Sequence, residues 1–144
     1  MPLRTFEEYV NSKIITKKSP DLLRAKSLID EAKQRKIYVD SVLNKIGVHN
    51  ENANYVIESC YDIIMEVIRS KLMINGYFSM GEAAHEAEIS YLRNLKFREE
   101  DIRFLNDLRF FRNGILYYGK KFDKDYAEKV VKFMEDNYEK LLRI

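Results

Sequence analysis

The sequence is poor in the residue types that fix covalent or metal-bound structure. Cys60 is its only cysteine, so no internal disulfide bond can form. Its two histidines, His49 and His85, have no clustered Cys or Asp at the spacing of metal ligands, and we expect neither a metal site nor a cofactor. Glycine-rich phosphate loops, nucleophile elbows and catalytic-triad patterns are also missing, which removes the enzyme classes that depend on them.

Chain breakers and long apolar runs are scarce as well. Two prolines and five glycines in a chain rich in Lys, Glu, Leu and Ile favour long helices. No apolar run approaches the roughly 18 residues that a membrane span needs. The start, Met1-Pro2-Leu3-Arg4, leads into charged residues rather than an apolar signal core. We therefore expect a cytoplasmic protein with no membrane segment.

Charge of one sign is nearly balanced by charge of the other. The net charge of +2 argues against strong nonspecific binding to nucleic acid, which needs several uncompensated basic side chains on one face. A local basic face stays open, because residues 93–121 hold eight basic and four acidic side chains. The alternative is that this excess is only a solvated helix surface.

Apolar residues recur at spacings of three and four along most of the chain, which predicts helices. Ser19-Pro20-Asp21 has the order of an N-cap, a first-turn proline and an acid, and Ser79 and Glu82 have the spacing of a capping box. Asn50 or Asn52 is expected to cap the third helix, and Asp123 or Asp125 the last. The predicted helices are a short one through 3–14, long ones ending at Gly47 and Gly76, a shorter one through 83–95, and two over 98–118 and 125–143.

No segment alternates with the period of two that strands show. With 144 residues, 46% apolar and 33% charged, the chain has the size and balance of one globular domain. Long amphipathic helices joined by short turns pack side by side. We therefore predict an all-α fold, an up-and-down antiparallel bundle of four to five main helices, as a single domain over residues 1–144. The helix ending at Gly76 is expected to be the most buried.

The helix over 98–118 carries two distinct faces. One face is apolar and is expected in the core: Phe104, Leu108, Phe111 and Ile115. The other combines aromatic and amide side chains: Asn106, Phe110, Asn113 and Tyr117. Arg109 and Arg112 lie between the two faces. Exposed aromatics beside Arg and Asn are typical of a contact with another chain, so we expect a homodimer through this helix. The alternative is that neighbouring helices of the same chain cover this face.

The end of this helix resembles a known family signature. Residues 112–119, Arg-Asn-Gly-Ile-Leu-Tyr-Tyr-Gly, are similar to the HEPN signature, in which Arg, often followed by Asn, precedes His by four to six intervening residues. Residues 54–77, closing on Gly-Tyr, resemble the family's second long helix, and 125–143 its last helix. His85 falls in a short helix where many relatives carry His. The chain thus resembles the HEPN superfamily, in particular HepT-like proteins associated with minimal nucleotidyltransferases.

The resemblance implies a chemistry as well as a fold. HEPN ribonucleases bring Arg and His of two subunits together and cleave RNA without a metal, the Arg stabilising charge on the phosphate and the His moving a proton. In HepT-type toxins a partner nucleotidyltransferase can silence the site by adenylylating a tyrosine just after the His. Here Tyr117, Tyr118 or Gly119 stands where the His is expected, and a phenol of pKa about 10 shuttles protons poorly at neutral pH.

Three hypotheses follow from the retained Arg112-Asn113 pair and the missing His. The first, which the missing His favours, is a dimeric module that is not an enzyme and binds a nucleotide, RNA or a partner protein. Its binding residues are expected to be Arg109, Arg112, Asn113, Tyr117, Tyr118 and Lys120. The second is a divergent ribonuclease or toxin whose catalytic candidates are Arg112, Tyr117 and His85, although a lone helical His is more often structural. The third is a regulatory partner of a minimal nucleotidyltransferase, as in toxin–antitoxin pairs.

Overall fold

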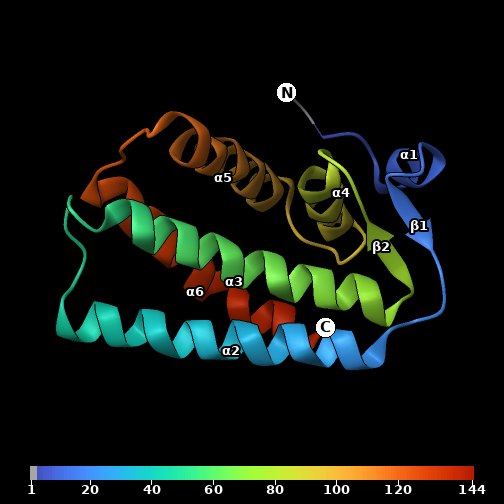
Figure 1. The fold of residues 1–144 in the computed structure, drawn as a ribbon, viewed down its shortest axis with the longest axis horizontal. Helices are drawn as coiled ribbons and strands as arrows, with labels where there is room; N and C mark the ends of the chain where they lie inside the picture. The colour runs from blue at the N-terminus through green and yellow to red at the C-terminus, as the bar shows by residue number, and fades with distance from the viewer. Residues whose placement is uncertain (1–2) are drawn as a thin grey trace.

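The computed structural model describes residues 3–144 as a predominantly helical protein (Figure 1). Met1 and Pro2, which open the charged N-terminal segment, lie outside the described residues. Over the described residues the helices are α1 Phe6–Asn11, α2 Leu22–Lys45, α3 Ala53–Ile74, α4 Ala84–Ser90, α5 Glu99–Tyr118 and α6 Lys124–Arg143, with a 3-10 turn at Tyr91–Arg93. The strands are β1 Ile15–Lys17 and β2 Tyr77–Ser79. The predicted all-α class is confirmed.

Helix α3 is the centre of the structure. It packs along α2 on one side and against α6 behind, while α4 and α5 lie on its other side (Figure 1). Its apolar residues point in nearly every direction, and among the described helices it buries the most side chains, as predicted. Ile57, Ile63 and Ile68 have no exposed surface at all. The removal of this apolar surface from water is the main free-energy gain that holds the other helices to α3.

The small sheet was not predicted. Instead of a helix through residue 14, α1 ends at Asn11, and Lys13 adopts a φ of 66°, which turns the chain into β1. β1 then pairs antiparallel with β2, with Ile15 opposite Ser79. Three-residue strands are too short to show a period of two, and their partners are some 60 residues apart in sequence. Only tertiary packing, which buries Ile15, brings these strands together.

Helix ends follow short-range rules, with some corrections. α2 is capped by Asp21, whose carboxylate accepts from the backbone N–H of Arg24 at 3.0 Å, so the predicted Ser19 cap is wrong by two residues. The predicted capping box at Ser79 is also wrong, because Ser79 belongs to β2 and α4 begins at Ala84. Asp123 caps α6, and Gly119 ends α5 in the left-handed conformation, as expected. No helix among residues 3–144 is long and apolar enough to cross a membrane.

Candidate functional site

Helix α5 places Arg112 against α3. The Nη2 atom of Arg112 lies 3.5 Å from Oδ1 of Asp62, and its guanidinium sits 5.3 Å from the ring centre of Tyr61. Its side chain is 21% exposed, yet its Nε atom is buried and has no hydrogen-bond partner among the described residues. A buried donor without an acceptor costs about 1–3 kcal/mol. Arg112 is therefore held against α3 with one buried donor unsatisfied, while part of its side chain remains open to solvent.

Tyr61 joins Arg112 to a second polar cluster. The Tyr61 hydroxyl lies 3.0 Å from Nδ1 of His85, whose Nε2 is 3.4 Å from Nη2 of Arg69. Arg69 in turn donates from Nε and Nη2 to the two carboxylate oxygens of Glu88, at 2.8 and 2.9 Å. Burial raises the pKa of Tyr61, an effect that Arg112 opposes. The chain Arg112–Tyr61–His85–Arg69–Glu88 thus runs through α5, α3 and α4.

His85 is held as a neutral imidazole in this cluster. Burial lowers its pKa below the ordinary value, with Arg69 and Arg112 acting in the same direction and Glu88 and Asp62 opposing them. A guanidinium can only donate, so its contact with Nε2 favours the tautomer with the proton on Nδ1, which then donates to the Tyr61 hydroxyl. Both ring nitrogens are therefore engaged within the protein.

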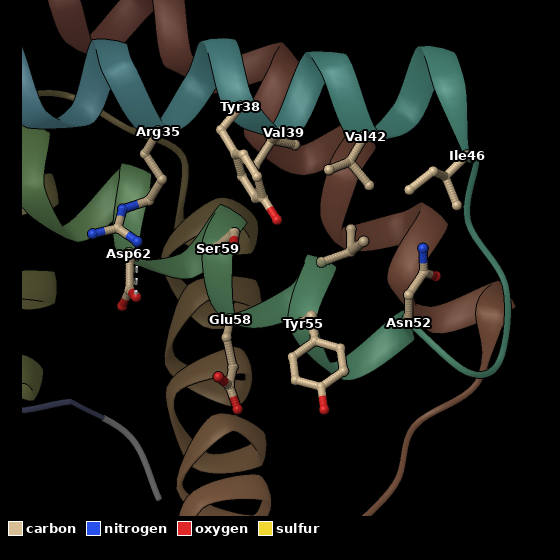
Figure 2. A pocket seen from close by; sticks show the side chains of 11 residues that line it. Arg35, Tyr38, Val39, Val42, Ile46, Asn52, Tyr55, Glu58, Ser59 and Asp62 are labelled. Atoms are coloured by element: carbon tan, nitrogen blue, oxygen red, sulfur yellow. Dashed lines mark ion pairs between the residues drawn. The ribbon is translucent and has the colours of Figure 1, made fainter.

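Asp62 is shared between two arginines on opposite sides of α3. Arg35 of α2 approaches Asp62 at 3.9 Å and donates from Nε to Glu66 at 3.0 Å. Figure 2 shows Arg35 and Asp62 at one end of a groove of about 360 Å³ between α2 and α3, with Tyr38 and Tyr55 further along it. Burial raises the pKa of Glu66, an effect that Arg35 opposes. The acids on this face are thus partly neutralised by Arg35 and Arg112.

The far end of α5 is an open aromatic surface. Phe110 is 70% exposed, Tyr117 74% and Tyr118 85%, so no other part of the described chain covers them. The core side of α5 is rotated from the prediction: its buried residues are Ile102, Leu105, Asn106 and Leu108. Asn106, expected on the open face, is buried and accepts from Nε of Arg109 at 3.1 Å. Phe104 and Phe111, expected in the core, are half-buried and contact the rings of Phe133 and Tyr126 of α6.

The predicted site residues therefore fall into two groups. Arg112 and His85 are brought close through Tyr61, while Tyr117 and Tyr118 lie at the exposed end of α5. The half-buried Asn113 lies between them on α5, and Arg109 sits one turn earlier. Lys120 follows α5, where its backbone carbonyl accepts from the side chain of Asn54 at 2.8 Å.

Sequence reasoning missed the residues that connect this cluster. Tyr61, Arg69 and Glu88 were not singled out, and neither was Asp62. The spacing of eight between Tyr61 and Arg69 puts them on one face of a helix, which is a usable signal. Glu88 is only 1% exposed, and no pattern in the sequence marks it as buried.

Among residues 3–144, no group of His, Cys, Asp or Glu side chains is arranged to hold a metal ion. No protein-family model, curated protein or solved structure matches the chain. The helical architecture is consistent with a HEPN-like fold.

Proposed function

We propose that the chain is a non-catalytic HEPN-like module, which forms a homodimer through α5 and binds the phosphate of a nucleotide or of RNA through Arg112 and Asn113. The observation that carries the proposal is the state of Arg112. Its guanidinium is positioned by Tyr61 and by a long ion pair to Asp62, and the side chain stays 21% exposed. A phosphate oxygen is the acceptor that such a planar, always charged donor binds best.

The dimer contact is supported by the open face of α5. Phe110 and Tyr117 are seven residues apart, so they form one stripe along the helix, and both are largely exposed. Aromatic side chains are enriched in protein interfaces, where they add large contact area. In a two-fold dimer this stripe would face its own copy, while Arg112 stays on the side of α5 that packs against α3.

The absence of turnover follows from how His85 is bound. To accept a proton, His85 would have to give up its contact with Arg69 and become an imidazolium beside that guanidinium. The lowered pKa of His85 expresses the same penalty. Tyr117 and Tyr118 occupy the sequence positions of the expected His, so no imidazole stands there. Binding without cleavage is the function that these groups support best.

The dimer is tested by sedimentation or by light scattering after size exclusion. We expect the wild type to have twice the mass of one chain, and the double variant Phe110→Ser/Tyr117→Ser to have the mass of one chain. Leu23→Ser is the matched control, because Leu23 is an equally exposed apolar residue on α2. A wild type that stays monomeric at high micromolar concentration would contradict the proposed contact.

Binding is tested by fluorescence anisotropy with a short labelled single-stranded RNA and by calorimetry with AMP. We expect Arg112→Ala to weaken binding roughly tenfold, the loss of one charge-assisted hydrogen bond. Arg103→Ala removes the same charge from an exposed position on α5 and serves as the control. Equal losses in the two variants would mean that only net charge matters, which contradicts a site at Arg112.

A second candidate, a divergent metal-independent ribonuclease, is favoured by one observation: Tyr61 links Arg112 to His85. It predicts RNA cleavage in the presence of a chelator, with the activity lost in His85→Ala. RNA that stays intact after long incubation with the wild type counts against it.

The third candidate, a partner of a minimal nucleotidyltransferase, is favoured by the accessible phenols of Tyr117 and Tyr118. Mass spectrometry that finds no added AMP after co-expression would contradict its modification form.

A further inference from the structure

A second cavity lies at the opposite end of α3 from the α5 aromatics. Its volume is about 510 Å³, and it is enclosed by the two strands, the start of α2, the last turns of α3, and α4. This volume is within the range of about 300–1,000 Å³ that small-molecule sites occupy. Two backbone hydrogen bonds hold its walls together: Lys18 N–H to the Gly76 carbonyl at 2.7 Å, and Asp21 N–H to the Met73 carbonyl at 3.2 Å. The cavity is therefore preformed by the fold.

The lining of this cavity is rich in positive charge. Lys18, Arg24 and Arg69 come from three separate segments, and Glu88 is the only acid among the lining residues. The Glu88 carboxylate is already occupied, because it accepts two hydrogen bonds from Arg69 and one from the Ser79 hydroxyl. Lys18 and Arg24 form no ion pair with any residue that the structure describes. The lining therefore carries two uncompensated charges and attracts anions.

Arg69 is held rigidly and still has donor capacity. Its Nε and Nη2 atoms are bound to Glu88, which fixes the plane of the guanidinium. Its Nη1 atom makes no hydrogen bond with the described residues and is not among the buried polar atoms that lack a partner. Nη1 is therefore accessible. A guanidinium positioned by a buried acid loses little further conformational entropy when it binds a ligand.

The remaining wall is apolar and aromatic. Met73 is buried, Phe78 and Tyr77 are half-buried, and Met80 is largely exposed at the rim. The Lys18 ammonium lies 5.9 Å from the centre of the Phe78 ring. A ligand that fits this lining has an anionic head for the cations and a flat or apolar body for Phe78 and the methionines.

We propose that this cavity binds a small organic phosphate monoester, with Lys18, Arg24 and Arg69 around the phosphate and the organic part against Phe78. The two uncompensated charges of Lys18 and Arg24 suit a group that carries close to two negative charges better than a single carboxylate. The guanidinium of Arg24 can pair with two phosphate oxygens, and Nη1 of Arg69 offers a further donor. The proposal is independent of the proposed function, because it uses neither Arg112 nor the dimer contact.

Phenyl phosphate is a suitable probe, because it combines the phosphate with a flat apolar body and nothing else. Calorimetry at low salt would compare it with inorganic phosphate and with phenol for the wild type, Lys18→Ala, Arg24→Ala and Arg24→Glu. Lys18 and Arg24 are exposed, so these changes leave the core intact, and circular dichroism verifies the fold. Arg103→Ala is the charge-matched control on α5, and a loss of binding in Arg112→Ala with none in Arg24→Ala would place the probe at the α5 site instead.

We expect phenyl phosphate to bind more tightly than inorganic phosphate and phenol to bind more weakly than either. Lys18→Ala and Arg24→Ala should each weaken the binding of phenyl phosphate roughly tenfold, because each loses one charge-assisted contact. Arg24→Glu should abolish this binding. Arg103→Ala should bind like the wild type. The proposal is overturned if the wild type does not bind phenyl phosphate, if phenol binds as well, or if Arg103→Ala loses as much affinity as Arg24→Ala.

Discussion

Removing the Glu88 carboxylate is the sharpest test of how the polar cluster is held. Glu88 is 1% exposed and accepts from Nε and Nη2 of Arg69 and from the hydroxyl of Ser79. In Glu88→Ala these three donors lose their acceptor, and the Arg69 charge loses its partner. Breaking a buried ion pair in this way costs about 3–5 kcal/mol. The Arg69 side chain is 26% exposed and water can reach part of it, so we expect the lower end, about 3 kcal/mol.

Urea denaturation followed by circular dichroism at constant pH measures this loss directly. For a domain of this size, about 3 kcal/mol also lowers the melting temperature by roughly 6–12 °C. The matched comparison is the double variant Arg69→Met/Glu88→Leu, which replaces both charges with apolar groups. We expect its free energy of unfolding to be within about 1.5 kcal/mol of the wild-type value, because no buried charge is left unpaired.

The double-mutant cycle of Arg69→Met, Glu88→Leu and their combination then gives the coupling between the two side chains. A coupling of about 2 kcal/mol is expected for a bidentate pair with one fully buried partner. The reasoning is refuted if the free energy of unfolding of Glu88→Ala is within about 0.5 kcal/mol of the wild-type value, or if the coupling energy is near zero. Either result would mean that the pair does not hold α4 on α3.

Three further predictions concern the backbone, the thiol and the imidazole. Gly76→Ala should lower the free energy of unfolding in urea by at least about 2 kcal/mol, because the added Cβ would lie 2.2 Å from the Lys18 carbonyl oxygen at a φ of +79°. Gly81 has a φ of +85° but open space around it, so Gly81→Ala should lower the free energy of unfolding by only about 1 kcal/mol. Equal losses in the two variants would contradict the clash at Gly76. Burial raises the pKa of Cys60 to about 12, so the thiol should react with a disulfide reagent only as the protein unfolds, and immediate reaction in native buffer would contradict this. Burial lowers the pKa of His85, so the unfolded chain takes up the proton first as pH falls; the free energy of unfolding should therefore decrease below about pH 6.5, and His85→Gln should flatten that decrease if His85 is its source.

The helices could be predicted because their signals are local. The stripe along α3, the glycine after α5 and the Asp123 cap each depend on residues within a few positions of one another. The errors arose where a distant segment decided the outcome. Ser79 looks like the first residue of a capping box, but pairing with Ile15 draws it into a strand, and the hydroxyl bonds to Glu88 instead.

The candidate site was only half visible in the sequence. Arg112 and His85 could be singled out by residue type and by family resemblance, and the open face of α5 could be read from a helical wheel. Their connection through Tyr61 could not, because a tyrosine in an apolar run is ordinarily a core residue. The cationic cavity was not visible at all, since Lys18, Arg24 and Arg69 stand in three different segments.

Composition and periodicity by themselves determined that this chain is helical and that α3 is its buried centre. These properties depend on contacts within one or two turns, which any observer of the sequence can count. Tertiary structure alone decided which polar side chains meet, because the rotation and offset of packed helices set those distances. It placed Arg112 on Tyr61, bound Arg69 to Glu88, and gathered three cations around one cavity.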